Sequence, residues 1–446
     1  MFSLAGLLVY LALEMVRPDI LFPAVRESLM FWVAAATAAM WLLEMILTPG
    51  WRTFPSTRFL VAFAAVGTLS TLVAGGDLAG ILDRLYSLGK ILLMYLILIQ
   101  CVRTEWRVRI VRWTLEGLIL WLVVGGVLFA NGHPIRGFSW DVQHRLQYSG
   151  IFSDPNDLAQ VYALFFTLLL YFVVNGSRWY LKVPAAGLLY LTGLAIVFTA
   201  SRGGVLGVIV GVFLCFRRRI GTLVPAVLSG ALLLTMTTMG FARMNMLNSE
   251  ESSAELRLLS WAQGWYMLHS HPVLGVGLQN WERYHHLAAH NSFIQVAAET
   301  GVLGLVFWLG FFYFPVEDSL LAILPGHKFE NPPLVAAQLQ AALLVWFVTA
   351  LFLTRNQTLT PYILAGLVLV ANHLPSRLHA QGELEIEPPT EDQIETQDGS
   401  FAEEQPEPKS SSRVLVSWAD MRNISLCVTL CLLWWRFMIR GMVPGL

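Results

Sequence analysis

The chain has 446 residues, of which 56% are hydrophobic and 13% are charged, and its mean hydropathy is +0.60. Soluble domains carry about 25% charged residues, so this composition excludes an ordinary soluble protein and predicts an all-α polytopic membrane protein. The formal net charge of −1 hides a strong asymmetry along the chain and says little about partners. We expect membrane lipids among the partners and no nucleic acid.

Apolar windows that are long enough, or nearly long enough, to cross a membrane recur along the chain. The N-terminus begins apolar, without a basic region or a small-residue cleavage site, and predicts a retained first span rather than a cleaved signal. In all, about 12 transmembrane helices are expected, near residues 2–16, 28–47, 59–74, 81–101, 113–130, 157–174, 183–200, 203–216, 221–240, 301–315, 334–353 and 361–374.

Basic loops orient these spans, because loops rich in arginine and lysine stay in the cytoplasm. The loops after the second, fourth, sixth and eighth windows carry Arg52, Arg58, Arg103, Arg107, Arg109, Arg112, Arg178, Lys182, Arg217, Arg218 and Arg219. All of them fall on one side if both ends of the twelve-span bundle are cytoplasmic. Residues 131–156 and 241–300 are then long periplasmic loops, and their Trp, His and Arg content predicts that they are ordered.

The composition changes after Pro375, where the transmembrane domain, residues 1–375, is expected to end. Residues 376–412 are acidic and nearly free of bulky apolar side chains, which predicts a disordered cytoplasmic linker. Residues 413–446 contain a short apolar stretch at 424–439, for which a thirteenth span, a re-entrant helix and an interfacial helix are all open. We expect truncation after Gln381 to leave activity largely intact.

The stretch TASRGG, residues 199–204, combines the features of a phosphate site. Ser201 is suited to cap a helix, and the glycines let the backbone approach a ligand closely. Arg202 at such a helix N-terminus would bind phosphate through the helix dipole and bidentate hydrogen bonds. The alternative is an arginine that merely extends to the membrane interface.

Residues 252–284 begin with a pattern typical of an amphipathic helix lying at the membrane interface. Trp261 and Trp265 are one turn apart, and tryptophan favours that interface. Arg257 lies on the same helix, either as an ordinary solvated charge or as a ligand contact. A glycine-rich turn, HPVLGVG at 271–277, follows it.

A polar stretch, HNS, directly precedes an apolar helix at residues 290–292. Asn291, Gln295 and Glu299 are spaced to share one helix face. Asn291 or Ser292 would cap this helix and leave His290 at its N-terminus, where the helix dipole disfavours the imidazolium ion. A neutral imidazole can take a proton from a hydroxyl. The alternative is a histidine with only a structural capping role.

Further candidates lie in the first outer loop, where Arg136, His144 and Arg145 are in a position to meet a substrate sugar or phosphate. The four cysteines all lie in apolar segments and form neither a CxxC pair nor a zinc spacing. They are expected to be small core residues, and no metal ligands are assigned.

Five motifs occur in an order that resembles the O-antigen ligase and O-antigen polymerase superfamily, and the segment LEMVRPDILFPAVR at 13–26 has the same look. The resemblance covers residues 10–375 and leaves out the tail. Its motifs are GIFSDPNDLA (150–159), TASRGG (199–204), ELR and Trp at 255–261, HPVLGVG (271–277) and AHNSFIQVAAETGVLGL (289–305).

The resemblance implies a metal-independent, cofactor-free membrane glycosyltransferase of the GT-C type. Such enzymes move a glycan from polyprenyl (undecaprenyl) diphosphate onto an acceptor hydroxyl at the periplasmic face of the bacterial inner membrane. By its motifs, Arg202 and Arg257 would hold the diphosphate and His290 would lie by the attacking hydroxyl. Apart from this carry-over, Arg136, Arg145 and Asn291 are candidates for further substrate contacts. Ligation to a lipid, chain polymerisation and protein glycosylation all stay open as reactions.

A transporter or flippase of lipid-linked glycan is the alternative, since about twelve spans suit it equally well. The chain shows no obvious hydropathy symmetry between its halves of the kind many transporters have. Its polar residues also gather in outer loops rather than in the middle of the spans. Both observations favour the transferase.

Overall fold

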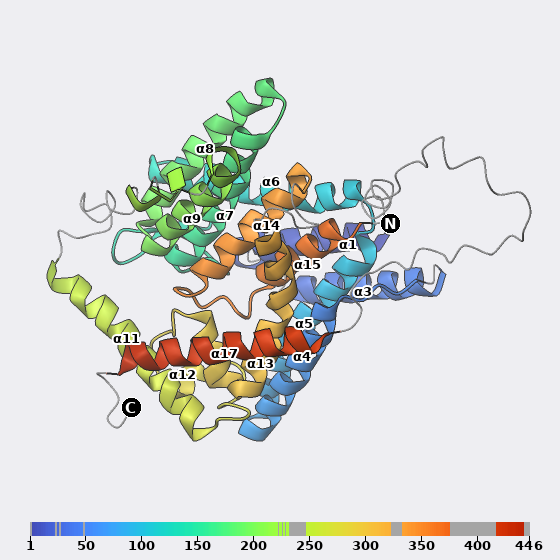
Figure 1. The fold of residues 1–446 in the computed structure, drawn as a ribbon, viewed down its shortest axis with the longest axis vertical. Coiled ribbons are helices and arrows are strands. Elements are labelled where there is room, and N and C mark those ends of the chain that lie inside the picture. The colour runs from blue at the N-terminus through green and yellow to red at the C-terminus, as the bar shows by residue number, and fades with distance from the viewer. Residues whose placement is uncertain are drawn as a thin grey trace, which may run out of the picture.

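The computed structural model describes residues 2–22, 25, 28–47, 50–221, 223–224, 226–227, 229–231, 247–322, 332–374 and 416–440. Its helices are α1 (Phe2–Val16), α2 (Pro18–Leu21), α3 (Ser28–Leu47), α4 (Pro55–Ala74), α5 (Leu78–Cys101), α6 (Glu105–Ala130), α7 (Pro155–Asn175), α8 (Trp179–Thr199), α9 (Arg202–Ile220), α11 (Leu247–Ser270), α12 (Trp281–Tyr284), α13 (Ser292–Leu321), α14 (Leu334–Thr349), α15 (Leu359–Asn372) and α17 (Trp418–Ile439) (Figure 1). The linker at 376–412 and most of the window near 221–240 lie outside the described residues.

The prediction of a polytopic, mainly helical membrane protein is confirmed. Within the described parts of the chain, seven helices are long and apolar enough to cross a membrane, namely α3, α4, α6, α7, α8, α13 and α17. Helices α1, α14 and α15 are apolar but shorter. The figure of about twelve spans stays a prediction.

The loop at 131–156 contains a small hairpin that the all-α prediction missed. Strand β1 (Phe138–Trp140) pairs antiparallel with β2 (Leu146–Tyr148). The turn closes because the Asp141 carboxylate accepts hydrogen bonds from the backbone N–H groups of Gln143, at 2.9 Å, and Arg145, at 2.7 Å. Such side-chain-to-backbone bonds stabilise tight turns.

The helices form two packed groups joined by a central pair (Figure 1). Helix α7 packs against α8 and α9, and α6 packs against α8. In the other group α13 packs against α4, α11 and α17. Helices α14 and α15 lie between the groups, since α14 contacts α7 and α9 while α15 contacts α5 and α13.

The loops that are predicted to be periplasmic from the distribution of basic residues contact one another at one end of this bundle. Hydrogen bonds there join Tyr148 to Val16, Ser201 to Asn156, Ser292 to Ala350 and Ser70 to Leu274. At the opposite end, where the cytoplasmic loops are predicted, the backbone N–H of Arg52 donates to Gln100 and its guanidinium to the carbonyl of His373. The contacts are therefore consistent with the predicted alternation of the loops.

Helix α13 begins nine residues before the predicted window at 301–315 because its first part is a separate helical segment that ends in a break at Gly301. Gly301 has a φ of 69° inside this helix, which a glycine adopts without strain. The HPVLGVG turn fills the break, with the N–H of Gly277 donating to the Glu299 carbonyl at 3.0 Å. A Cβ at Gly301 would lie 2.2 Å from the Val273 carbonyl oxygen, so the turn and the helix fit only with glycine there.

Candidate functional site

The N-terminus of α13 is built by its capping residue. The Asn291 side-chain oxygen accepts hydrogen bonds from the N–H groups of Phe293, at 2.9 Å, and Ile294, at 3.1 Å. Of the two predicted caps, the structure therefore selects Asn291. Because Asn291 is fully buried in this role, its part in the fold is structural, and its proposed contact with substrate stays untested.

His290 precedes this cap in a left-handed backbone conformation, with a φ of 46°. That conformation is uncommon for a residue with a side chain and requires support from its surroundings. The indole N–H of Trp261 donates to the carbonyl of Ala289 at 2.8 Å. On the other side, the Ser292 hydroxyl donates to the carbonyl of Leu353 at 2.6 Å. The His290 turn is thus held from α11 and from the loop that joins α14 to α15.

The TASRGG stretch forms the predicted helix start. The Ser201 hydroxyl accepts a hydrogen bond from the N–H of Gly204 at 3.2 Å, and Arg202 is the exposed first residue of α9. Ser201 also donates to the side-chain oxygen of Asn156 at 2.8 Å. This bond joins the TASRGG motif to the start of α7 in the GIFSDPNDLA motif, two segments that lie far apart in the sequence.

Three charged residues, Arg257, Asp154 and Arg145, act on His290. Burial lowers the pKa of His290 below its ordinary value, and the positive charge of Arg257 lowers it further. The carboxylate of Asp154 acts in the opposite direction, and Arg145 again lowers the pKa of His290. Burial likewise lowers the pKa of Arg257, which also interacts with Asp154, Arg202 and Arg145. Burial and the two arginines therefore favour the neutral imidazole.

The two arginines proposed from the first outer loop have different surroundings. Arg145 begins the return of the hairpin, is bound to Asp141 at 2.7 Å, and is electrostatically coupled to His290 and Arg257. Arg136 is exposed, and its guanidinium lies 5.4 Å from the ring centre of Phe22. We therefore keep Arg145 in the candidate site and leave Arg136 out of it.

Two charged residues of this region were not singled out from the sequence. Asp154 caps α7 by accepting from the N–H of Asn156 at 2.8 Å, and the Asp-Pro pair at 154–155 is a recognisable helix-start signal. Arg355 is buried in the α14–α15 loop, where its guanidinium donates to Asp157 at 3.1 Å and to the carbonyl of Ile151 at 2.7 Å. Its only sequence signal is its place between two apolar windows.

Arg355 also ties α7 to α13. Its backbone N–H donates to the Ser292 hydroxyl at 2.9 Å, while its side chain reaches the start of α7. One residue therefore sets the distance between the His290 turn and the segment that contains Asp154. A buried charge held in this way is costly to disturb, because removing one partner leaves the other charge unpaired.

The predicted polar face of α13 is present and buried. The Gln295 amide donates to the Glu299 carboxylate at 2.9 Å, and the Gln357 amide donates to its other oxygen at 2.7 Å. The N–H of Trp281 approaches the first oxygen at 3.4 Å. Glu299 thus joins α13, α12 and the α14–α15 loop behind the His290 turn, which is a supporting role rather than contact with a substrate.

Helix α11 is present and its tryptophans pack inside the molecule, while its position at the membrane interface stays a prediction. Trp261 is buried, and Trp265 lies with its ring centre 5.2 Å from that of Trp435 on α17. These rings pack against α17. Arg257 lies one turn before Trp261 and is half-buried, and both interpretations of it, a solvated charge or a ligand contact, stay predictions.

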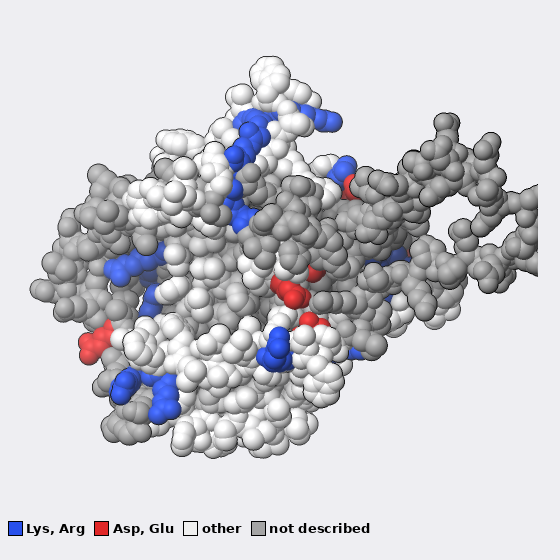
Figure 2. All heavy atoms as spheres, viewed as in Figure 1, with Lys and Arg blue, Asp and Glu red and all other residues white. Residues whose placement is uncertain are grey.

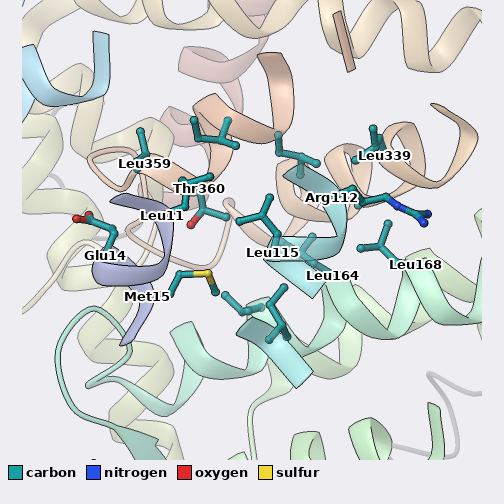
Figure 3. Close-up of a pocket in the computed structure, with 15 residues that line it drawn as sticks. Leu11, Glu14, Met15, Arg112, Leu115, Leu164, Leu168, Leu339, Leu359 and Thr360 are labelled. Atoms are coloured by element: carbon teal, nitrogen blue, oxygen red, sulfur yellow. The ribbon is translucent and has the colours of Figure 1, made fainter. Parts of the chain in front are cut away.

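The surface over this region is basic, and a small apolar cavity lies elsewhere in the molecule. Figure 2 shows basic side chains on the side of the molecule where α9 and α11 lie in Figure 1. Figure 3 shows a cavity of about 60 Å³ between α1, α6, α7, α14 and α15, lined largely by leucines. Glu14 and Arg112 border it with their charged ends turned away. The cavity shares no residue with the His290 cluster, so we assign it no part in the site.

What this site can do follows from its charges. The half-buried Arg145 and Arg257, together with the exposed Arg202 at the N-terminus of α9, are suited to a multiply charged anion such as a diphosphate. The neutral imidazole next to it can accept a proton. Across the described ranges of the chain, no three His, Cys, Asp or Glu side chains are grouped in a way that could hold a metal ion.

Comparison with known proteins identifies part of the chain. Residues 185–309 match the O-antigen ligase family, which confirms the resemblance indicated by the sequence motifs. The matched segment contains Arg202, Arg257 and His290, whereas Arg145 and Asp154 lie before it. No curated protein matches the chain. The match supports an O-antigen ligase-type function in polysaccharide biosynthesis.

Proposed function

We propose that this chain, with its O-antigen ligase domain at residues 185–309, is a glycosyltransferase of the bacterial inner membrane with its active site at the periplasmic face. It transfers a glycan from polyprenyl (undecaprenyl) diphosphate to an acceptor hydroxyl on a lipid, a glycan or a protein. The observation that carries this proposal is the half-buried His290 at the mouth of α13, on which Arg257 and Arg145 act, with Arg202 acting in turn on Arg257.

The reaction is a displacement at the anomeric carbon of the donor sugar. The acceptor oxygen forms a bond to that carbon as the bond from the carbon to the diphosphate oxygen breaks. His290 takes the acceptor proton, and polyprenyl diphosphate leaves with the bonding electron pair. Arg202 and Arg257 stabilise the negative charge that grows on the leaving group, which is a large source of catalysis where water is excluded.

The expected depth of the site in the membrane suits a glycan donor that is anchored in the bilayer by its polyprenyl chain. The diphosphate of a polyprenyl carrier lies at the level of the headgroups. Arg202 is the first residue of α9, and Arg257 lies within α11, which is not one of the candidate membrane spans. Three arginines supply charge that a divalent ion provides in other transferases. We therefore propose that the transfer needs no metal, and activity should persist after treatment with a chelator.

The test is activity in detergent with purified lipid-linked glycan and a candidate acceptor. A transferase forms a new glycosidic product and releases polyprenyl diphosphate under these conditions. A transporter or flippase needs two compartments and forms no product. Absence of any product over a panel of lipid, glycan and protein acceptors, with donor bound by the folded protein, would favour the transporter.

A further inference from the structure

The C-terminal helix α17 has two apolar faces. One face is packed inside the molecule and comprises Ile424, Val428, Trp435 and Ile439, each at most 5% exposed. The other carries the exposed side chains Leu426, Leu430, Leu433 and Phe437. An interfacial helix would present a charged or polar face opposite its apolar one, whereas a helix that is apolar on both faces suits a membrane interior.

The contacts at the two ends of α17 fix its direction. Near its start, the Asn423 amide donates to the hydroxyl of Tyr313, which lies in the second half of α13. Near its end, the indole N–H of Trp435 donates to the carbonyl of Trp261 on α11 at 2.9 Å. Since α13 starts at the His290 turn, α17 runs antiparallel to α13 and finishes beside the candidate site. Figure 1 accordingly shows α17, in red, with one end beside α11.

The length of α17 is sufficient for a crossing. Its 22 residues extend about 33 Å at 1.5 Å per residue, and the hydrocarbon core of a bilayer is about 30 Å thick. Arg422 and Arg436 lie within a few residues of its two ends, from which long side chains can reach the headgroups.

A short chain of buried hydrogen bonds joins α17 to His290. Trp435 donates to the carbonyl of Trp261, and the Trp261 indole in turn donates to the carbonyl of Ala289, next to His290. Two ring contacts lie beside these bonds. The ring centres of Trp434 and Trp261 are 5.5 Å apart, and those of Trp265 and Trp435 are 5.2 Å apart. Helix α11, which carries Arg257, is thus held between α13 and α17.

We propose that α17 crosses the membrane as a further span that ends on the face where His290 lies, and that Trp435 positions α11 within the site. The tail is then part of the working unit, contrary to the expectation that truncation after Gln381 is harmless. The proposal that α17 crosses the membrane is independent of the proposed function. The positioning role of Trp435, in contrast, rests on the proposed function.

Labelling of single cysteines tests the crossing. In full-length chains whose four native cysteines are replaced by alanine, Trp418→Cys and Arg440→Cys place exposed thiols at the two ends of α17, and His133→Cys marks the first outer loop. With a membrane-impermeant maleimide added to spheroplasts, Arg440→Cys and His133→Cys should react, and Trp418→Cys should react only after lysis. Reaction of Trp418→Cys and Arg440→Cys from the same side would overturn the crossing.

Turnover per folded molecule tests the positioning role. Trp435→Ala should lower kcat on the order of 10²-fold, the cost of a small misplacement of catalytic groups, and Trp435→Phe, which keeps a ring but lacks the indole N–H, should recover only part of the loss. Phe437→Ala, on the exposed face of the same helix, is the matched control and should behave like the wild type. A wild-type kcat in Trp435→Ala, or an equal loss in Phe437→Ala, would overturn the role. Absence of transfer by the wild type would contradict the proposed function and leave the labelling result intact.

Discussion

At the scale of single residues, the proposed diphosphate site depends on the hydrogen-bonding geometry of arginine, which lysine does not share. A guanidinium grips two phosphate oxygens with a planar fork, and a lysine keeps only the charge. Arg202→Lys and Arg257→Lys should each therefore lower turnover severely, by about 10²-fold for a lost charge-stabilising contact, with normal membrane insertion. Arg109→Lys, in an exposed pair with Glu105, is the control and should be nearly silent. Wild-type turnover in Arg257→Lys would remove that arginine from the diphosphate site.

The pH dependence of the rate follows from the lowered pKa of His290. A base works only when neutral, so the rate should be constant near pH 7 and fall only as the pH drops below the ordinary histidine pKa of about 6.5. Asp154→Asn removes the charge that favours the imidazolium and should move this fall to lower pH. Arg257→Gln removes an opposing positive charge and should move it to higher pH. The pH–rate profiles of the three proteins measure this, and three coincident profiles would contradict the electrostatic account.

The residues of the site were accessible from the sequence to different degrees. Ser201, Arg202 and Asn291 follow from helix-capping patterns, which act over three or four residues. Asp154 carries a similar signal next to Pro155 that the motif analysis did not use. Arg355 has no local signal, because its partners Asp157 and Ser292 are brought to it only by the packing of α7, α13 and α14.

At the scale of elements, most helices follow from apolar windows, and the exceptions have identifiable causes. The hairpin of β1 and β2 depends on a turn closed by one aspartate, and strands of three residues carry no periodic signal. The inward packing of Trp261 depends on contact with α17. The composition of the C-terminal tail does not predict that α17 packs against α11. The early start of α13 depends on the break at Gly301, where the HPVLGVG turn supplies the partners of the helix carbonyls.

Gly301→Ala tests this break. A side chain at a φ of 69°, placed 2.2 Å from the Val273 carbonyl oxygen, should cost about 1–3 kcal/mol of stability. Gly117→Ala in α6 is the control, because nothing lies within 4 Å of the added methyl group and alanine favours a helix. Thermal unfolding in detergent should show a lower Tm for Gly301→Ala alone. Equal Tm values for the two variants would mean that the break is not required.

At the scale of the whole molecule, the alternation of basic and polar loops predicts sidedness. Reporter fusions after Gly132 and Ser253 should report the periplasm, and a fusion after Gly399 should report the cytoplasm. These positions sample the first outer loop, the second outer loop and the acidic linker. If the fusions after Ser253 and Gly399 report the same compartment, the arrangement of spans between them is wrong.

The central claim is that His290 takes the proton from the hydroxyl of the acceptor, at a site whose arginines hold the diphosphate of the glycan donor. Its most direct test is the turnover of His290→Ala per folded molecule with purified donor and acceptor, measured together with donor affinity. His286→Ala, an exposed neighbour, is the control. The account predicts a loss of about 10²–10⁴-fold in rate with donor affinity retained and the control unaffected. Undiminished turnover in His290→Ala would contradict it.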